Sequence, residues 1–306
     1  MTDTTPMRGV LSPVVTPFDE QLRPDVERLT AHCRWLLSHD CGLAVFGTNS
    51  EGNSLSVEEK IDIVDQLVDA GLDPARMMPG TGACALPDVV KLSRHMTEIG
   101  CGGVLMLPPF YYKGVSDEGI YRSIAEVIHR VGDDRLRVYL YHIPPVAQVG
   151  FSHDLIERLI RDFPRIVAGI KDSSGDWNNT KAMIERFPGW GVFSGNELVL
   201  VDTLKAGGVG CISATCNINA PAIVELYRRW QEPDAAERQA ACNALRNKVG
   251  QYIMIPALKA VIAHYSGDKN WNRLRPPLVE FDAATVEKIG RELEAFGFDM
   301  PGLKAA

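Results

Sequence analysis

One lysine that follows a run of apolar residues is the strongest candidate for chemistry in this sequence. Lys171 comes directly after Ile166–Ile170, a run that predicts a buried strand carrying the ammonium group at its end. Removal of water from this group would favour the neutral amine, which attacks carbonyl carbon. The alternative is a structural lysine that pairs with Asp172 or caps the following helix, and the residue types alone leave both open.

Two tyrosines lie at the ends of neighbouring predicted strands and could move protons. Tyr141 lies in the sequence YHIPP and Tyr112 in PPFYY. A phenol beside an imine can pass a proton without adding a fixed charge. Each tyrosine alone could equally be a packed aromatic residue with a hydrogen-bonded hydroxyl. Together with Lys171 they form a plausible proton-transfer set.

The loop GTNSEGNS, residues 47–54, offers hydroxyls, an amide and backbone N–H groups. It precedes a helix that Ser56 and Glu59 could start with a capping box, so it is suited to holding a carboxylate. The plain alternative is a turn rich in Gly, Asn and Ser. Glu51 within it could be a base or an acid that stabilises the helix dipole.

Motifs for metals and nucleotides do not stand out. Of the seven histidines only His142 ends a predicted strand, and none forms an H-x-x-x-H or H-E-x-x-H pair. The seven cysteines contain no C-x-x-C, so we expect reduced thiols, no disulfide and no zinc. The glycine-rich stretches 80–82 and 206–210 fit no nucleotide-binding fingerprint, and the second predicts a helix-to-strand turn.

The elements that must position these residues alternate along the chain. Short apolar runs rich in β-branched residues are separated by amphipathic segments, which predicts repeated βα units and a parallel sheet covered on both faces. The eight expected strands are Val10–Thr16, Gly42–Gly47, Arg76–Gly80, Gly103–Leu107, Val138–His142, Ile166–Lys171, Gly191–Ser194 and Gly208–Ser213. The clearest expected helices are Pro24–His39, Val57–Ala70, Pro87–Ile99, Asp117–Arg130 and Asp154–Phe163.

Eight such units match an α/β (β/α)8 TIM barrel, whose catalytic groups project from the C-terminal ends of the strands. Three further helical patterns follow without a strand signal. We therefore predict a barrel over residues 1–231 and a C-terminal helical extension over residues 232–306.

Composition excludes several classes of protein. The chain has 306 residues, of which 45% are hydrophobic and 23% charged, as in globular proteins. Its net charge of −7 has the wrong sign for a nucleic-acid partner. The uncharged stretch Ala206–Val224 is too rich in Gly and polar residues for a membrane span, and the N-terminus lacks the apolar core of a signal peptide. We expect a cytoplasmic protein with no membrane partner.

Five motifs in order give the chain a family resemblance. They are GTNSEGNSL (47–55), LPPFYYKGVSDEG (107–119), YHIPP (141–145), GIKDSSGD (169–176) and GGVGCISAT (207–215). Nearly the whole chain resembles the dihydrodipicolinate synthase and N-acetylneuraminate lyase family of class I pyruvate-type aldolases. The resemblance implies a 2-oxo acid substrate, no cofactor beyond a covalent lysine imine, and a homotetramer built as a dimer of dimers.

The resemblance also implies roles for single residues. Lys171 would form the Schiff base, Tyr141 would shuttle the proton, and Thr48 would link to Tyr141 by hydrogen bonds. Tyr112 would complete the relay from a neighbouring subunit. The remaining predicted residues contact substrate, with its carboxylate on the Thr48–Asn49 segment. That substrate-binding set is Thr48, Asn49, Gly195 and Ile212, with no metal ligand.

Departures from the family pattern bear on the substrate. The synthase branch has G-T-T-G-E where this chain has Asn49 and Ser50, and it has an Arg, which grips a carboxylate, where this chain has Val146. The KDSSGD sequence is more similar to branches acting on 2-keto-3-deoxy sugar acids or 4-hydroxy-2-oxo acids. We therefore predict an aldolase or dehydratase for such an acid.

Three alternatives are kept. The first is 4-hydroxy-tetrahydrodipicolinate synthase, which joins pyruvate and aspartate semialdehyde. The second is a non-catalytic family member that binds an oxo acid. The third is a metal-dependent barrel enzyme with Glu51, Asp172 and His142 as ligands.

Overall fold

The computed structural model describes residues 6–303. The chain divides by its packing into two units. The first unit combines the residues up to Gly9 with Asp73–Ile212, and the second combines Val10–Leu72 with Ser213–Ala306. The sequence instead predicts two continuous segments, a barrel over residues 1–231 and an extension over residues 232–306. That division stays a prediction.

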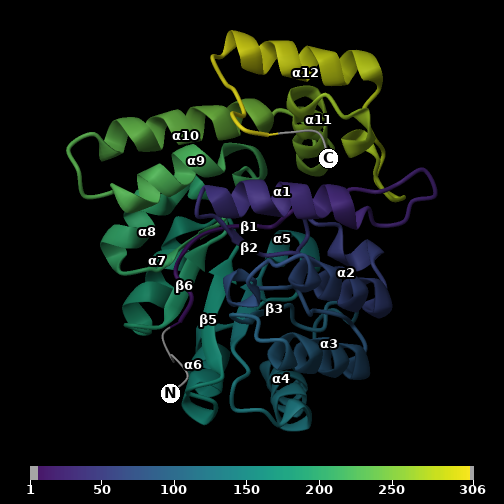
Figure 1. The fold of residues 1–306 in the computed structure, drawn as a ribbon. Coiled ribbons are helices and arrows are strands. Elements are labelled where there is room, and N and C mark those ends of the chain that lie inside the picture. The colour runs from purple at the N-terminus through teal and green to yellow at the C-terminus, as the bar shows by residue number, and fades with distance from the viewer. Residues whose placement is uncertain (1–5, 304–306) are drawn as a thin grey trace. The chain divides into compact units, whose positions relative to one another are not determined.

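The first unit is a parallel α/β structure (Figure 1). Its five strands lie in the order β7-β6-β5-β4-β3, with every neighbouring pair parallel. The strands are β3 (Val104–Met106), β4 (Val138–His142), β5 (Val167–Asp172), β6 (Gly191–Ser194) and β7 (Gly210–Ile212). The helices are α3 (Leu86–Glu98), α4 (Asp117–Val131), α5 (Pro144–Ala147), α6 (His153–Asp162), α7 (Trp177–Arg186) and α8 (Leu200–Ala206), with short 3-10 turns at Pro74–Arg76 and Glu197–Val199.

Local signals explain where several of these helices begin and end. Ser116, Ser152 and Asp176 each accept a hydrogen bond from a backbone N–H in the first turn of α4, α6 and α7. The predicted helix-to-strand turn at 206–210 is confirmed, because Gly207 ends α8 with a φ of 105° that glycine adopts without strain.

One predicted strand, Arg76–Gly80, does not form a strand in the described residues. Gly80 makes a single parallel bridge to Leu105 of β3. Leu105 N donates to Pro79 O at 2.8 Å, and Thr81 N donates to Leu105 O at 3.0 Å. Pro79 has no N–H to donate, so a regular ladder cannot continue through this segment. The described residues therefore hold seven strands where eight were predicted.

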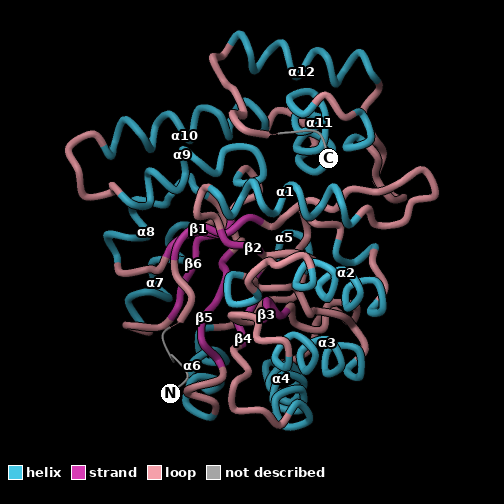
Figure 2. The backbone as a smooth tube through the Cα atoms, in the orientation of Figure 1, coloured by secondary structure: helices cyan, strands magenta, loops and turns pink. Residues whose placement is uncertain are grey.

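The second unit is mostly helical (Figure 2). It contains the parallel pair β1 (Gly9–Ser12, of which Gly9 belongs to the first unit) and β2 (Gly42–Leu43), with Leu11 opposite Gly42. Its helices are α1 (Val26–Ser38), α2 (Val57–Asp69), α9 (Cys216–Arg228), α10 (Ala235–Val249), α11 (Met254–Ser266) and α12 (Ala283–Ala295), with 3-10 turns at Gly52–Ser54 and Lys269–Asn272.

Several sequence expectations for this unit are confirmed. The three helices expected after residue 232 are α10, α11 and α12. Ser56 and Glu59 form the predicted capping box of α2, each side chain accepting from the other's backbone N–H. Both strands are shorter than expected, and beyond β2 the chain turns through a left-handed residue, Phe46, at φ 64°.

The uncharged stretch Ala206–Val224 spans the end of α8, β7 and much of α9. Asn219 interrupts α9 with non-helical backbone angles, two residues before Pro221. Across residues 6–303 no helix is both long enough and apolar enough to cross a membrane.

Candidate active site

Lys171 and Tyr141 face each other on adjacent strands of the first unit. The parallel register of β4 and β5 places Tyr141 directly opposite Lys171, so both side chains lie on one face of the sheet. Lys171 Nζ donates to Tyr141 Oη at 3.2 Å and lies 4.3 Å from the centre of its ring. Both residues are 2% exposed. The structure thus pairs a buried amine with a phenol.

A fully buried aromatic residue, Tyr139, supports this pair. It lies two residues before Tyr141 on β4 and therefore on the same face. Its ring packs edge-on against Phe193, the register partner of Lys171 on β6, with centroids 5.9 Å apart. Its hydroxyl accepts from Met7 N at 2.6 Å, and burial raises the pKa of Tyr139 to about 12. Tyr139 is therefore a neutral structural residue beside the Lys171–Tyr141 pair.

Glycines make room for Tyr139. A Cβ atom at Gly169 would lie 2.7 Å from the Tyr139 ring and 2.2 Å from Gly191 O. A Cβ at Gly103 would lie 2.6 Å from the same ring. The sequence analysis did not identify Tyr139 or the glycines around its ring. The spacing of Tyr139 and Tyr141, with a glycine on the next strand, could have indicated this packing.

Asp172 has its own partners on the opposite face of β5. It accepts from Ser174 N at 2.9 Å, Asn179 Nδ2 at 3.1 Å and Thr180 Oγ1 at 2.6 Å. Successive residues of a strand point to opposite faces, so Asp172 points away from the face that carries Lys171. These contacts anchor the loop after β5 to α7, and the alternative of a Lys171–Asp172 pair is wrong.

His142 is likewise held by its own contacts. Its Nδ1 accepts from Phe151 N at 3.0 Å, which places the proton of the neutral ring on Nε2. Burial lowers the pKa of His142, and the charge of Asp172 acts in the opposite direction. Within the described residues, no group of three or more His, Cys, Asp or Glu side chains is arranged to hold a metal ion.

Two predicted substrate-binding residues lie at the same end of the sheet as Lys171. A Cβ at Gly195 would lie 2.5 Å from Asp172 O and 2.3 Å from Ser173 Oγ, so the chain after β6 passes directly against the residues after Lys171. Ile212 is the buried last residue of β7, which pairs with β6.

Tyr112 is in a different environment. It lies in the loop after β3 with 72% of its surface exposed, and its ring is 5.4 Å from that of Tyr111. Lys113 ties this loop to α5, because its Nζ donates to Phe110 O and, at 2.7 Å, to Ala147 O. A side chain this exposed is not enclosed with Lys171 inside one chain.

Thr48 and Asn49 lie in the second unit, in a tight loop where both are half-buried. Gly47 O accepts from Ser50 N at 3.1 Å and Gly52 N at 3.0 Å. Only glycine fits at position 52, because a Cβ there would lie 2.0 Å from Phe46 O.

Glu51 in the same loop is completely buried in an ion pair with Lys259 of α11. This contact engages the carboxylate, so the structure supports neither the general-base nor the helix-dipole interpretation of Glu51. Sequence reasoning missed Lys259, because a lysine within the mostly apolar helix α11 gives no indication of its partner in the sequence.

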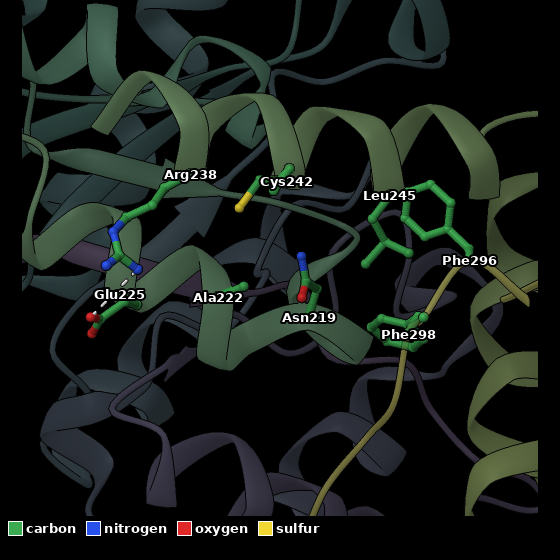
Figure 3. Close-up of a pocket in the computed structure, with 10 residues that line it drawn as sticks. Asn219, Ala222, Glu225, Arg238, Cys242, Leu245, Phe296 and Phe298 are labelled. Atoms are coloured by element: carbon green, nitrogen blue, oxygen red, sulfur yellow. Dashed lines mark ion pairs between the residues drawn. The ribbon is translucent and has the colours of Figure 1, made fainter. Parts of the chain in front are cut away.

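A cavity of about 240 Å³ lies in the second unit between α9, α10 and residues 296–298 (Figure 3). Arg238 and Glu225 form an ion pair of 3.7 Å at one end of it. Apolar side chains, including Leu245 and Phe296, line the other end. None of the predicted site residues lines this cavity, so it is separate from the candidate active site.

Comparison with known proteins places the chain in a family. The model of the "Dihydrodipicolinate synthetase family" matches residues 6–296. An "Uncharacterized DapA-like lyase" of Chloroflexus aurantiacus is 33% identical over 92% of this chain and 94% of its own. A 4-hydroxy-tetrahydrodipicolinate synthase of Thermus thermophilus is 35% identical over 95% of this chain and 96% of its own.

A solved structure gives the same assignment. The dihydrodipicolinate synthase of Agrobacterium tumefaciens superposes with a TM-score of 0.85 at 28% identity, covering 94% of this chain and 99% of that one. The chain therefore belongs to the dihydrodipicolinate synthetase family and is an enzyme of its lyase and aldolase class.

Proposed function

We propose that this enzyme forms an imine between Lys171 and a 2-oxo acid and then cleaves or dehydrates that acid. The observation that carries the proposal is the buried Lys171 Nζ hydrogen-bonded to Tyr141 Oη at 3.2 Å. A lysine amine is a nucleophile for carbonyl carbon, and the phenol provides a proton-transfer group within reach.

The reaction balances without a separate cofactor. The Lys171 amine adds to the 2-oxo carbon, and loss of water leaves a protonated imine. The phenol of Tyr141 gives its proton to the hydroxyl that leaves as this water and becomes a phenolate. In the aldol direction the phenolate removes the proton of the 4-hydroxyl group, the C3–C4 bond breaks, and its electron pair enters the imine to give an enamine. An aldehyde leaves, the enamine is protonated at C3, and water releases pyruvate and the free lysine.

The other predicted residues take the roles that the family resemblance implies. The substrate carboxylate lies on Thr48–Asn49, Thr48 links to Tyr141, and Gly195 and Ile212 line the pocket floor. We also infer a closed (β/α)8 barrel over residues 1–231, with the bridged segment 76–80 as its eighth strand, and a helical extension over 232–306. We propose a cytoplasmic homotetramer, as the family resemblance implies, in which Tyr112 completes a neighbour's site. The exposed ring of Tyr112 agrees with this last role.

The substrate class is the finer part of the proposal. Val146, in α5 directly after β4, is 61% exposed and cannot form a bidentate ion pair with a second carboxylate. This favours a 2-keto-3-deoxy sugar acid or a 4-hydroxy-2-oxo acid. The second candidate, 4-hydroxy-tetrahydrodipicolinate synthase, is supported by the identity to the Thermus thermophilus enzyme.

Borohydride trapping tests the chemistry. The protein is incubated with pyruvate and reduced, and peptide mass spectrometry locates the added mass. We expect an adduct on Lys171 and none in Lys171→Ala, which should have no turnover. An unmodified Lys171 with both pyruvate and 2-oxoglutarate would refute the imine.

A substrate comparison then separates the two candidates. Release of pyruvate from 2-keto-3-deoxy acids and 4-hydroxy-2-oxo acids is measured beside condensation of pyruvate with aspartate semialdehyde. A dehydratase is detected by 2-oxo acid product without pyruvate. Faster condensation than cleavage or dehydration would identify the synthase instead.

A further inference from the structure

The loop that contains Thr48 and Asn49 is held by a completely buried ion pair between Glu51 and Lys259. Glu51 and Lys259 have side chains that are 0% exposed. Lys259 Nζ donates to Glu51 Oε1 and, at 2.7 Å, to Arg273 O. Burial lowers the pKa of Lys259 to about 8, while the charge of Glu51 acts in the opposite direction. Two charges are thus removed from water and satisfied by each other and by backbone.

The second oxygen of Glu51 is also engaged. Glu51 Oε2 accepts from Arg275 N at 3.1 Å. The Arg275 side chain forms an ion pair with Glu59 in the first turn of α2 and donates to Ser54 O at 2.6 Å. The segment 273–275 therefore holds both Glu51 and the end of the loop that leads into α2.

The backbone at Glu51 needs such support. Its φ of 54° and ψ of 33° are left-handed, a conformation that costs free energy in a residue with a side chain. Glu51 N donates to Thr48 O at 3.1 Å, and Thr16 Oγ1 donates to Ser50 O at 2.7 Å. The conformation of Glu51 is thereby connected to that of Thr48 through the intervening turn.

A buried ion pair contributes little net stability, since desolvation offsets much of its attraction, but it holds its partners in one arrangement. We propose that Glu51 and Lys259 are positioning residues that fix the Thr48–Asn49 segment in the shape that takes the substrate carboxylate. This inference rests on the proposed function. It gives α11 a part in oxo-acid binding although none of its residues needs to touch the substrate.

The test compares two carbonyl probes. Lys259→Met keeps the apolar stem and removes the charge. Imine trapping at Lys171 is titrated with pyruvate and with hydroxyacetone, a ketone that lacks the carboxylate. We expect the half-saturating concentration of pyruvate to rise about tenfold or more, because a small displacement of the groups that bind the carboxylate weakens binding. The half-saturating concentration of hydroxyacetone should stay within about twofold of the wild-type value.

A matched control changes another ion pair of the same unit. Lys248, on α10, pairs with Glu292 at 3.0 Å. Lys248→Met should leave the half-saturating concentrations of both probes unchanged. Equal changes for the two probes in Lys259→Met, or none for either, would show that the Glu51–Lys259 pair only stabilises the fold and would overturn the inference.

A milder variant covers the case in which Lys259→Met does not fold. Glu51→Asp keeps the charge but shortens the reach by one methylene, and the same selective loss of pyruvate binding is expected to a smaller degree. A folded Glu51→Asp variant whose half-saturating concentrations of pyruvate and hydroxyacetone both equal those of the wild type would refute the inference. Wild-type protein without a Lys171 adduct from either probe would instead refute the proposed function.

Discussion

At the scale of single residues, the register of two strands determines which side chains lie against each other. Lys171 and Tyr141 are opposite each other because β4 and β5 are parallel and paired at that level. A shift of one residue would send Tyr141 to the other face and bring His142 toward Lys171. The chemistry proposed for the pair therefore depends on the packing that fixes this register.

Replacing Tyr141 tests its part in proton transfer. Tyr141→Phe keeps the ring and removes the hydroxyl that accepts from Lys171. We expect turnover to fall by a factor of about 10²–10⁴, the usual contribution of a general acid or base, while pyruvate is still trapped on Lys171. Steady-state kinetics and borohydride trapping measure the two effects.

Tyr139→Phe is the matched control, because it removes a hydroxyl whose partner is Met7 N rather than Lys171. Its turnover should stay near that of the wild type. A Tyr141→Phe variant with unchanged turnover would remove Tyr141 from the mechanism.

A buried histidine makes stability depend on pH. His32 in α1 stacks on Trp35 and meets Trp271 edge-on, and burial lowers the pKa of His32 from 6.5 to about 4. The unfolded chain therefore binds more protons than the folded one between these values. His32 has its full stabilising effect above pH 6.5, and about 3 kcal/mol is lost as the pH falls to about 4.

Urea unfolding at pH 7, 5.5 and 4.5 measures this effect. The free energy of unfolding of His32→Leu should fall less steeply with decreasing pH than that of the wild type. Parallel pH profiles for the two proteins would show that His32 does not contribute.

At the scale of elements, the close approach of strands decides whether Lys171 and Tyr141 can pair. Gly169→Ala would place a methyl group against Gly191 O and the Tyr139 ring. We expect the free energy of unfolding to fall by about 1–3 kcal/mol from overpacking, with reduced imine trapping at Lys171. Denaturant unfolding and trapping yield measure both consequences.

Gly119→Ala is the control from α4 of the same unit. A Cβ there would lie 3.7 Å from Ser116 Oγ, an ordinary contact, so stability should be equal or slightly higher. Equal free energies of unfolding for Gly169→Ala and the wild type would mean that strands β4, β5 and β6 adapt to the added methyl group.

At the scale of the whole molecule, the proposed assembly predicts sharing of active sites between subunits. Tyr112→Phe and Lys171→Ala should each be inactive or nearly so when pure. After the two are unfolded, mixed and refolded, we expect about a quarter of wild-type activity, because half of randomly formed dimers are mixed and each holds one intact site.

The activity of the mixture shows whether Tyr112 acts on Lys171 of a neighbouring subunit or on Lys171 of its own chain. If Tyr112 acted on Lys171 of its own chain, no mixed dimer would contain an intact site, and the mixture would stay as inactive as its components. Sedimentation of the wild type tests the assembly itself, with four times the chain mass of 33.7 kDa expected.

Local patterns in the sequence predict those features that depend on residues adjacent in the chain. The alternation of apolar runs and amphipathic segments identified most of the strands and helices, the capping residue Ser56 marked the start of α2, and the apolar run before Lys171 predicted a buried amine. These features depend on neighbours in the chain, so the residues that cause them are adjacent in the sequence.

Contacts between residues that are distant in the sequence appear only in the folded chain. Glu51 and Lys259 are 208 positions apart, and Tyr139 needs glycines on other strands. The segment around Pro79 ended as a bridge rather than a strand, because strand formation needs a partner's hydrogen bonds as well as an apolar run. Packing and charge pairing across the fold leave no periodic signal in the sequence, so they become visible only when the chain is folded.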